Sequence, residues 1–159
     1  GEAYTEIIVS QAALSTGGDT TILLYEKFDD TTTVDSNSEF DGTKFPNFSG
    51  TASKAYTSKY GGVKLGSSKA AGYITSKSLD LSKAFTVTLD ACKYGSDTGN
   101  IVVTVGDAEQ TIPNSELAAA GTFKTFTLTF DAATATSTVK IATSSKRAYI
   151  DNVKIVYAE

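Results

Sequence analysis

Short segments in which apolar and polar residues alternate recur along most of this chain. In the segment 84–94, Phe85, Val87, Leu89 and Ala91 alternate with threonine and aspartate, which is the pattern of a half-buried β-strand. By similar criteria, further strands are predicted at 20–28, 63–65, 72–76, 101–105, 123–130, 139–141 and 148–157. The pattern therefore predicts about eight strands separated by turns.

Turn signals separate these segments, and a sustained helical period is missing. Gly106 and Asp107 form a hairpin-type turn signal. Residues 114–120 are predicted to form one helical turn, with Asn114 as its N-cap and Gly121 as its terminator. Two sheets of such strands bury their apolar faces against each other. We therefore predict an all-β fold, an antiparallel β-sandwich of the jelly-roll type.

Two stretches of the chain lack this alternation. Residues 29–62 are rich in aspartate, serine and threonine but also carry five aromatic residues, which indicates a loop that packs onto the domain. Phe45 and Phe48 flank Pro46, and we expect them to anchor this loop. Residues 1–19 are weakly patterned, and we assign them to an N-terminal tail, linker or edge strand that precedes a sandwich domain at 20–159.

The amino-acid composition excludes several classes of function. The 159 residues suit one domain, and the net charge of −4 does not favour nucleic acid or anionic lipid as partners. The absence of histidine excludes serine–histidine nucleophiles and imidazole zinc sites. Cys92, the single cysteine, is expected to be a buried inert thiol. No apolar run approaches the ~20 residues that cross a bilayer.

The last predicted strand contains a shift in its apolar phase. Counting back from Tyr157, the inward phase reaches position 151, which is an aspartate, while Ile150 is the next strongly apolar residue. A shift of one residue indicates a β-bulge. An acid near the core needs a positively charged partner. Lys146, Arg147 or a bound calcium ion would be that partner. Calcium prefers oxygen ligands, and Glu26 and Asp29 would complete its site if the terminal strands lie side by side.

Three segments resemble a known family. LLYEKFDD from residue 23, GYITSKSLDLSKAFTVTLDA from residue 72 and AYIDNVKIV from residue 148 are similar to jelly-roll, galactose-binding-like modules of secreted bacterial proteins. These include carbohydrate-binding modules and surface lipoproteins of gut Bacteroidetes. The resemblance implies a structural calcium between an acid of the first strand, here Glu26 or Asp29, and the closing Asp151. Asn152 replaces a second aspartate that is frequent there.

A carbohydrate site needs aromatic rings that stack on sugars and polar groups that bind hydroxyls. The chain has no tryptophan, so tyrosines are the available platforms. The candidate ligand-binding residues are Tyr56, Tyr60, Tyr73, Tyr94, Asp97, Asn100 and Arg147. Each tyrosine alone is also compatible with a role in the core or as cover for a sheet edge.

Three classes of function are compatible with the sequence. The first is a non-catalytic carbohydrate-binding or adhesion module that binds a neutral polysaccharide, since the acidic surface suits polyanionic glycans poorly. The second is a structural or protein-interaction domain of the same fold, and the third is a glycosidase or lyase with two carboxylates, for which no spacing is recognisable. We expect an extracellular or cell-surface location, as a monomer or as part of a larger protein, although no signal-peptide pattern begins the sequence.

Overall fold

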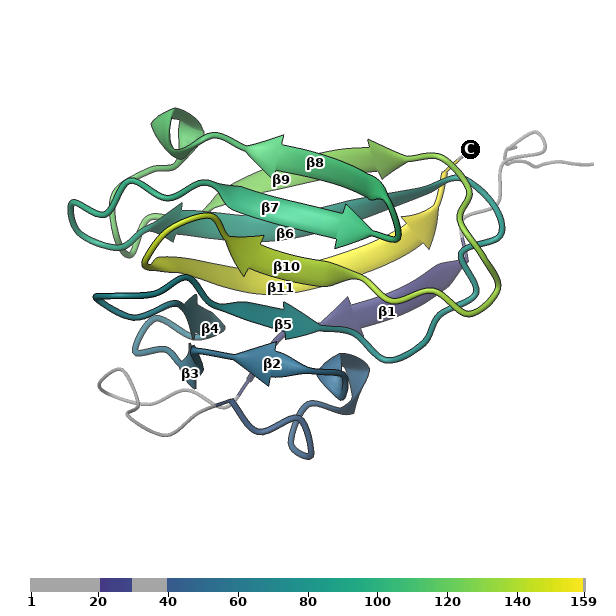
Figure 1. Ribbon diagram of the computed structural model, residues 1–159, viewed down its shortest axis with the longest axis horizontal. Coiled ribbons are helices and arrows are strands. Elements are labelled where there is room, and N and C mark those ends of the chain that lie inside the picture. Colours follow the sequence, from purple (N-terminus) through teal and green to yellow (C-terminus); the bar gives the residue numbers. More distant parts are fainter. Residues whose placement is uncertain (1–20, 30–39, 159) are drawn as a thin grey trace, which may run out of the picture.

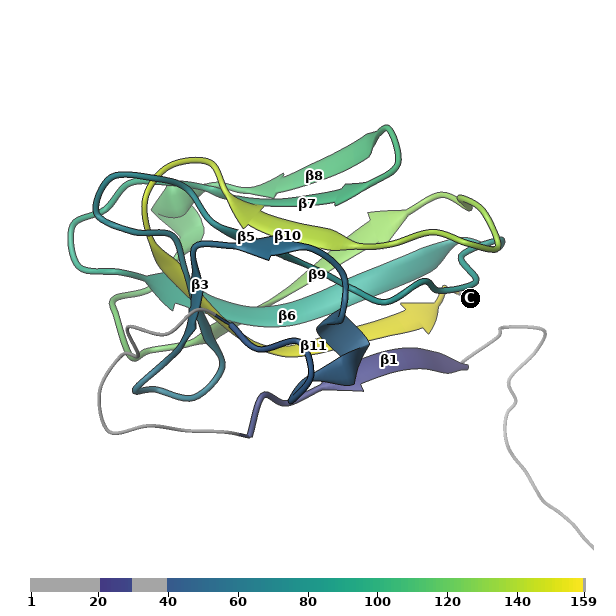
Figure 2. The same cartoon turned by 60° about the horizontal axis from the view of Figure 1, so that its bottom comes forward.

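The strands of the protein form two antiparallel sheets that lie face to face (Figures 1 and 2). The structure is a computed structural model that describes residues 21–29 and 40–158. Within these residues the chain forms eleven strands and two 3₁₀ turns. They are β1 (Ile22–Glu26), η2 (Pro46–Phe48), β2 (Ala52–Ser53), β3 (Ala55–Thr57), β4 (Val63–Leu65), β5 (Tyr73–Thr75), β6 (Phe85–Lys93), β7 (Ile101–Val105), β8 (Ala108–Ile112), η3 (Asn114–Glu116), β9 (Lys124–Phe130), β10 (Lys140–Thr143) and β11 (Ala148–Tyr157).

The chain passes back and forth between the two sheets, which are here called sheet A and sheet B. Sheet A has the order β3-β4-β11-β6-β9, with β1 also beside β11, and sheet B has the order β2-β5-β10-β7-β8. Strand pairs are antiparallel throughout the described residues. The predicted antiparallel jelly-roll sandwich is therefore confirmed.

The core lies between the sheets because every second residue of each central strand points inward. The side chains of Phe85, Val87 and Leu89 in β6 are fully buried, and so are those of Ile101 and Val103 in β7. The intervening threonines are half-buried. Burial of these apolar side chains, each contributing ~1.5–3 kcal/mol, holds the two sheets together.

Most strands lie where the alternation predicts them, and the misses have physical causes. The bounds of β4, β7 and β11 match the prediction, whereas β2, β3 and β8 were not predicted. Four of the five residues of β8 are exposed, so this edge strand shows no alternation. The predicted helical turn shrinks to η3, and Asn114 provides no side-chain cap. Its amide instead donates hydrogen bonds to the carbonyls of Asp97 and Gly99.

The long loop is anchored by a cluster of phenylalanines. The ring centroid of Phe28 lies 5.4 Å from that of Phe45, 5.5 Å from that of Phe48 and 6.1 Å from that of Phe40. Phe45 and Phe48 are buried, so their predicted anchoring role is confirmed. The proposed tail 1–19 lies outside the described residues.

Strand β11 organises sheet A around an irregularity. Its register with β6 shifts between Asp151 and Lys154, and Asn152 has a positive φ of 48°. The predicted bulge is therefore confirmed. Along one edge of β11, residues 148–150 pair with β4 and residues 153–156 pair with β1. The first and last strands lie side by side as expected, and Asp151 lies where β4 gives way to β1.

Two further findings concern single features of the sequence. Cys92 is a buried free thiol, as predicted, and burial raises its pKa. Across residues 21–29 and 40–158, no helix has the length and apolar character needed to span a bilayer.

Candidate functional site

Four tyrosines gather on the outer face of sheet A. This tyrosine cluster consists of Tyr56, Tyr60, Tyr94 and Tyr149. Strand register places Tyr56 of β3 opposite Lys64 of β4, and Lys64 opposite Tyr149 of β11. Tyr94 directly follows β6, and Tyr60 lies in the turn that leads to β4. Residues far apart in the sequence therefore meet on one surface.

Tyr149 is the centre of the cluster. It is only 2% exposed, although it alternates with the inward-facing Ala148 and Ile150 and does not belong to the core between the sheets. Its ring centroid lies 5.0 Å from that of Tyr60 in an edge-to-face pair and 5.5 Å from that of Tyr94 in a stacked pair. Tyr149 is thus buried by other tyrosines, and Tyr60, which is 39% exposed, carries the open surface.

Basic groups lie over the rings of the cluster. The Arg147 guanidinium carbon is 3.9 Å from the centre of the Tyr94 ring. The Lys64 ammonium lies 4.8 Å from the centre of Tyr56 and 5.8 Å from that of Tyr94. These are cation–π distances. The surface therefore combines aromatic faces with hydrogen-bond donors.

An ion pair holds the rim beside Tyr94. The Arg147 side chain donates to the Asp97 carboxylate at 2.8 Å, and the Arg147 backbone N–H donates to it at 3.2 Å. These hydrogen bonds hold the pKa of Asp97 below its usual value. Asn100 accepts a hydrogen bond from the backbone N–H of Asn114. Both predicted rim residues thus have structural partners within the protein.

The predicted ligand-binding residues are therefore partly brought together. Tyr56, Tyr60, Tyr94 and Arg147 share one surface, and Asp97 borders it. Tyr73 lies in β5 of sheet B, where the Lys140 ammonium is 4.3 Å from its ring centre. Sequence reasoning missed Lys64 and Tyr149. The signal that could have found Tyr149 is the shifted phase of β11, since Tyr149 precedes the inward-facing Ile150.

A second group of polar residues follows next along β11. Asp151 lies directly opposite Asp90 of β6, an arrangement of like charges that destabilises a sheet. Asn152 separates the two, since its backbone N–H donates to Asp151 and its side-chain amide donates to Asp90. Burial, together with the charges of Asp90, Asp29 and Glu26, raises the pKa of Asp151 to about 6. Asp90 and Asp151 thus form a partly buried anionic centre between β6 and β11.

The predicted calcium ligands lie around this centre without forming a closed cage. Glu26 accepts hydrogen bonds from the Phe28 N–H and from the Asn47 amide. In the part of the chain that the structure describes, no three acidic or thiol side chains are close enough to hold a metal ion. Arg147, a predicted partner of Asp151, pairs with Asp97 instead.

Comparisons with known proteins identify the fold of this chain but show no family to which it belongs. No family model and no curated protein matches the chain. Among solved structures, it is similar to the C-terminal CBM6 of LamC, a marine laminarinase from Zobellia galactanivorans, with a TM-score of 0.53, 11% identity, and coverage of 84% of this chain and 98% of that one. Jelly-roll carbohydrate-binding modules therefore share its fold.

Two other structures show the same likeness. The CBM36-1 domain of a multidomain xylanase from the hindgut metagenome of Trinervitermes trinervoides has a TM-score of 0.53 and 13% identity, over 86% of this chain and 98% of that one. The K3 cleaved adhesin domain of Lys-gingipain from Porphyromonas gingivalis has a TM-score of 0.56 and 17% identity, over 87% and 99%. At such identities the likeness concerns the fold alone.

Proposed function

We propose that this chain is a non-catalytic carbohydrate-binding module that binds a neutral polysaccharide on the tyrosine cluster. The observation that carries the proposal is the assembly of four tyrosines on one sheet face, with Tyr60 exposed over a buried Tyr149. The structural likeness to carbohydrate-binding modules supports it. The parent would be an exported or surface protein, such as those of gut Bacteroidetes that the sequence resembles.

The chemistry of sugar binding suits this surface. One face of a sugar ring carries C–H groups that pack on an aromatic ring, while its hydroxyls need polar partners. Tyr60 supplies the ring, and the Lys59 ammonium, 5.2 Å from the centre of that ring, supplies hydrogen-bond donors. Tyr149 supports Tyr60 from below and keeps it in place. The site thus binds by stacking on a preformed surface, without a catalytic step.

Replacing Tyr60 with alanine tests the proposal. We expect affinity for a neutral polysaccharide to fall about tenfold or more, since a stacking ring at the centre of a site commonly contributes over ~1.4 kcal/mol. The free energy of unfolding should fall by only about 1 kcal/mol, the value of an aromatic pair. Affinity electrophoresis and calorimetry across neutral polysaccharides measure the first, and urea denaturation the second.

The matched control is Tyr73→Ala, which removes a half-buried tyrosine from sheet B. It should leave the affinity unchanged. Equal affinities of the Tyr60→Ala variant and the parent protein would contradict the proposed surface.

A structural calcium at Asp151 is also part of the proposal. The charges of Glu26, Asp29 and Asp90 all act on the carboxylate of Asp151. Among the described residues no lysine or arginine pairs with Asp151. Oxygen donors and uncompensated negative charge are the chemistry that calcium prefers. Because these side chains are not close enough to hold an ion as they stand, calcium would have to draw Asp151, Glu26 and Asp29 together, and it would then neutralise the repulsion and join the first strand to the last.

The pH dependence of stability tests this centre. Because the pKa of Asp151 is raised to about 6 in the folded protein, the folded state binds more protons than the unfolded state between about pH 4 and 6. Without calcium, the free energy of unfolding should therefore fall as pH rises through this window. Asp151→Asn should remove this part of the slope. Denaturation with a chelator at several pH values measures it.

Calcium should reverse the loss at neutral pH. It binds the ionised carboxylate, so it should raise the melting temperature of the parent protein at pH 7.5 and much less at pH 4.5. The Asp151→Asn variant should respond weakly at both. No calcium response of the parent protein at pH 7.5 would contradict the metal site, while the pH slope would still report on Asp151 alone.

One observation favours a second candidate function. The polar groups beside Tyr94 already have partners within the protein, since Arg147 binds both Asp97 and the ring. Such a closed network suits a structural or protein-interaction domain. Failure of every polysaccharide to bind, with Tyr60→Ala stable, would favour this second function.

A further inference from the structure

A strap of polypeptide lies beside the tyrosine cluster. The strap consists of residues 117–122, which lead from η3 to β9. Ala118 forms a bridge with Cys92 of β6, and the Lys93 N–H donates to the Ala118 carbonyl at 2.9 Å. Residues 119–122 are mainly exposed. The strap is therefore tied to sheet A at β6, while its remainder faces solvent.

The strap covers an outward-facing residue of β6. Cys92 follows the inward-facing Ala91 and lies opposite Tyr149 of β11. It is fully buried, although it does not belong to the core between the sheets. The Gly121 N–H donates a hydrogen bond to the Cys92 thiol. This bond places Gly121 on the outer face of sheet A, next to the cluster.

Gly121 is in direct contact with the ring of Tyr60. A Cβ atom at Gly121 would lie 3.1 Å from Cε1 and 3.4 Å from Cζ of this ring. Both separations are shorter than the ~3.5–4.0 Å at which carbon atoms pack best. The ring therefore lies against the bare backbone of the strap, and any side chain at position 121 would push it away.

The other contacts of Tyr60 hold its backbone and one side of its ring. The Tyr60 N–H donates to the hydroxyl of Ser58 at 3.0 Å, and Ser58 is fully buried. The Tyr149 ring meets the Tyr60 ring edge to face, with 5.0 Å between the centroids. Because the Tyr60 side chain is 39% exposed, the ring has room to turn outward when it is pushed. Its orientation thus depends on the strap.

We propose that Gly121 is a positioning residue of the polysaccharide site, which sets the orientation in which Tyr60 presents its ring to a sugar. The inference rests on the proposed function. A stacking ring binds best when it is held in its bound orientation before the ligand arrives. Gly121 acts through Tyr60, and its φ of +88° together with the missing side chain makes the close approach possible.

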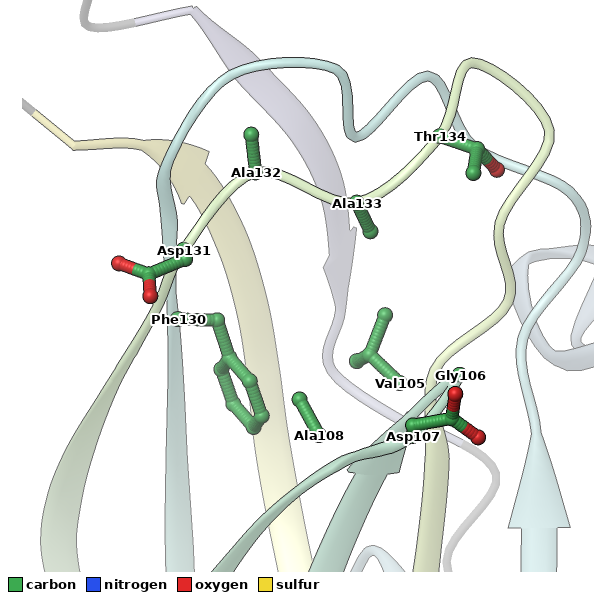
Figure 3. Close-up of a pocket in the computed structure, with 9 residues that line it drawn as sticks. All are labelled: Val105, Gly106, Asp107, Ala108, Phe130, Asp131, Ala132, Ala133 and Thr134. Carbon is green, nitrogen blue, oxygen red and sulfur yellow. The ribbon is translucent and has the colours of Figure 1, made fainter.

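A matched control glycine lies at the other end of β7 from the cluster. Gly106 lies in the β7–β8 turn, beside a pocket that Phe130 lines (Figure 3). The carboxylates of Asp107 and Asp131 point away from this pocket, so they offer no sugar-binding group inside it. Gly106 has a φ of +57°, and a Cβ there meets no described atom within 4 Å. Gly106→Ala therefore adds backbone strain without a ring contact.

Affinity and ring orientation are measured on the full protein. The probes are four neutral polysaccharides: β-1,3-glucan, arabinoxylan, galactomannan and starch. For those that bind, we expect Gly121→Ala to weaken binding about threefold and Gly121→Asn about tenfold, since a larger side chain displaces the ring further. Gly106→Ala should leave the affinity unchanged. Gly121→Ala and Gly106→Ala should each lower the melting temperature by about 2–4 °C.

The asparagine variant separates ring displacement from backbone strain. Asparagine adopts a positive φ more readily than alanine, so strain alone would make Gly121→Asn the milder change. NMR of the protein with ¹³C-labelled tyrosine rings gives a readout that needs no ligand. Both Gly121 variants should shift the Tyr60 ring resonances, and Gly106→Ala should not.

A double-mutant cycle tests whether Gly121 acts through Tyr60. Once Tyr60→Ala has removed the ring, adding Gly121→Ala should change the affinity by less than about 1.5-fold. Two independent residues would instead multiply their effects.

Four other outcomes would overturn the inference. If Tyr60→Ala weakens binding but neither Gly121 variant does, the positioning role is removed and the proposed function stands. Weaker binding by Gly121→Ala than by Gly121→Asn would assign the effect to backbone strain. Unchanged Tyr60 resonances in Gly121→Asn would remove the role even without a ligand. Equal affinities of Tyr60→Ala and the parent protein would remove both the proposed surface and this inference.

Discussion

Replacing Tyr149 with alanine should lower the free energy of unfolding by about 3–5 kcal/mol, the cost of deleting a large buried aromatic side chain. The ring is 2% exposed and contacts both Tyr60 and Tyr94. Its removal leaves a cavity on the outer face of sheet A, beside the rings of Tyr60 and Tyr94. Urea denaturation at pH 7 measures the loss.

Two controls separate the ring from the hydroxyl and from tyrosine loss in general. Tyr149→Phe keeps the ring, so it should retain most of the stability and the polysaccharide affinity. Tyr25→Ala removes a tyrosine that is 46% exposed and should cost about 0.5 kcal/mol or less. A loss below about 1 kcal/mol for Tyr149→Ala would show that the cluster does not depend on its central ring.

Replacing Gly62 with alanine should have the second large effect. Gly62 has a φ of +73°, and a Cβ atom there would lie 2.1 Å from the Ile150 carbonyl oxygen and 2.8 Å from the Asp151 Cβ. The backbone of β11 cannot yield without disturbing the bulge. We expect a loss of about 2–4 kcal/mol, from steric overlap added to the strain of a left-handed alanine.

Gly95→Ala is the matched control for this substitution. Gly95 also has a positive φ, of +51°, but a Cβ there meets nothing within 4 Å. It should cost only about 1 kcal/mol, the conformational strain alone. Denaturation curves of the two variants isolate the steric part. Equal losses would show that the turn carrying Tyr60 tolerates displacement from β11.

The bulge at Asp151 shows how far a local pattern can reach. A strand buried on one face must keep a period of two, so a shift of one residue in the apolar phase could only mean an extra residue. With the bulge in place, the same period of two puts Tyr149 on the outer face, because it alternates with the inward-facing Ala148 and Ile150. It did not indicate that Tyr149 is buried, because the rings that cover it come from two other segments of the chain.

Strand β8 shows what a local sequence pattern does not predict. β8 pairs with β7 through its backbone but exposes most of its side chains, so the tertiary ladder, and no hydrophobic pattern, makes it a strand. The Asn114 side chain likewise bonds to the carbonyls of Asp97 and Gly99 rather than capping a helix. The pairing of β8 and the hydrogen bonds of Asn114 both depend on residues outside the local segment, so a local pattern does not reveal them.

The sequence by itself determined the all-β class, the positions of most strands, the buried Cys92 and the bulge beside Asp151, because each follows from the alternation of neighbouring residues. Only the tertiary structure decided which tyrosines meet, that Asp151 faces Asp90, and that a pocket opens beside Phe130. Strand order in the sheets sets these contacts. That order arises from burying two whole faces against each other, and no short segment of the chain encodes it.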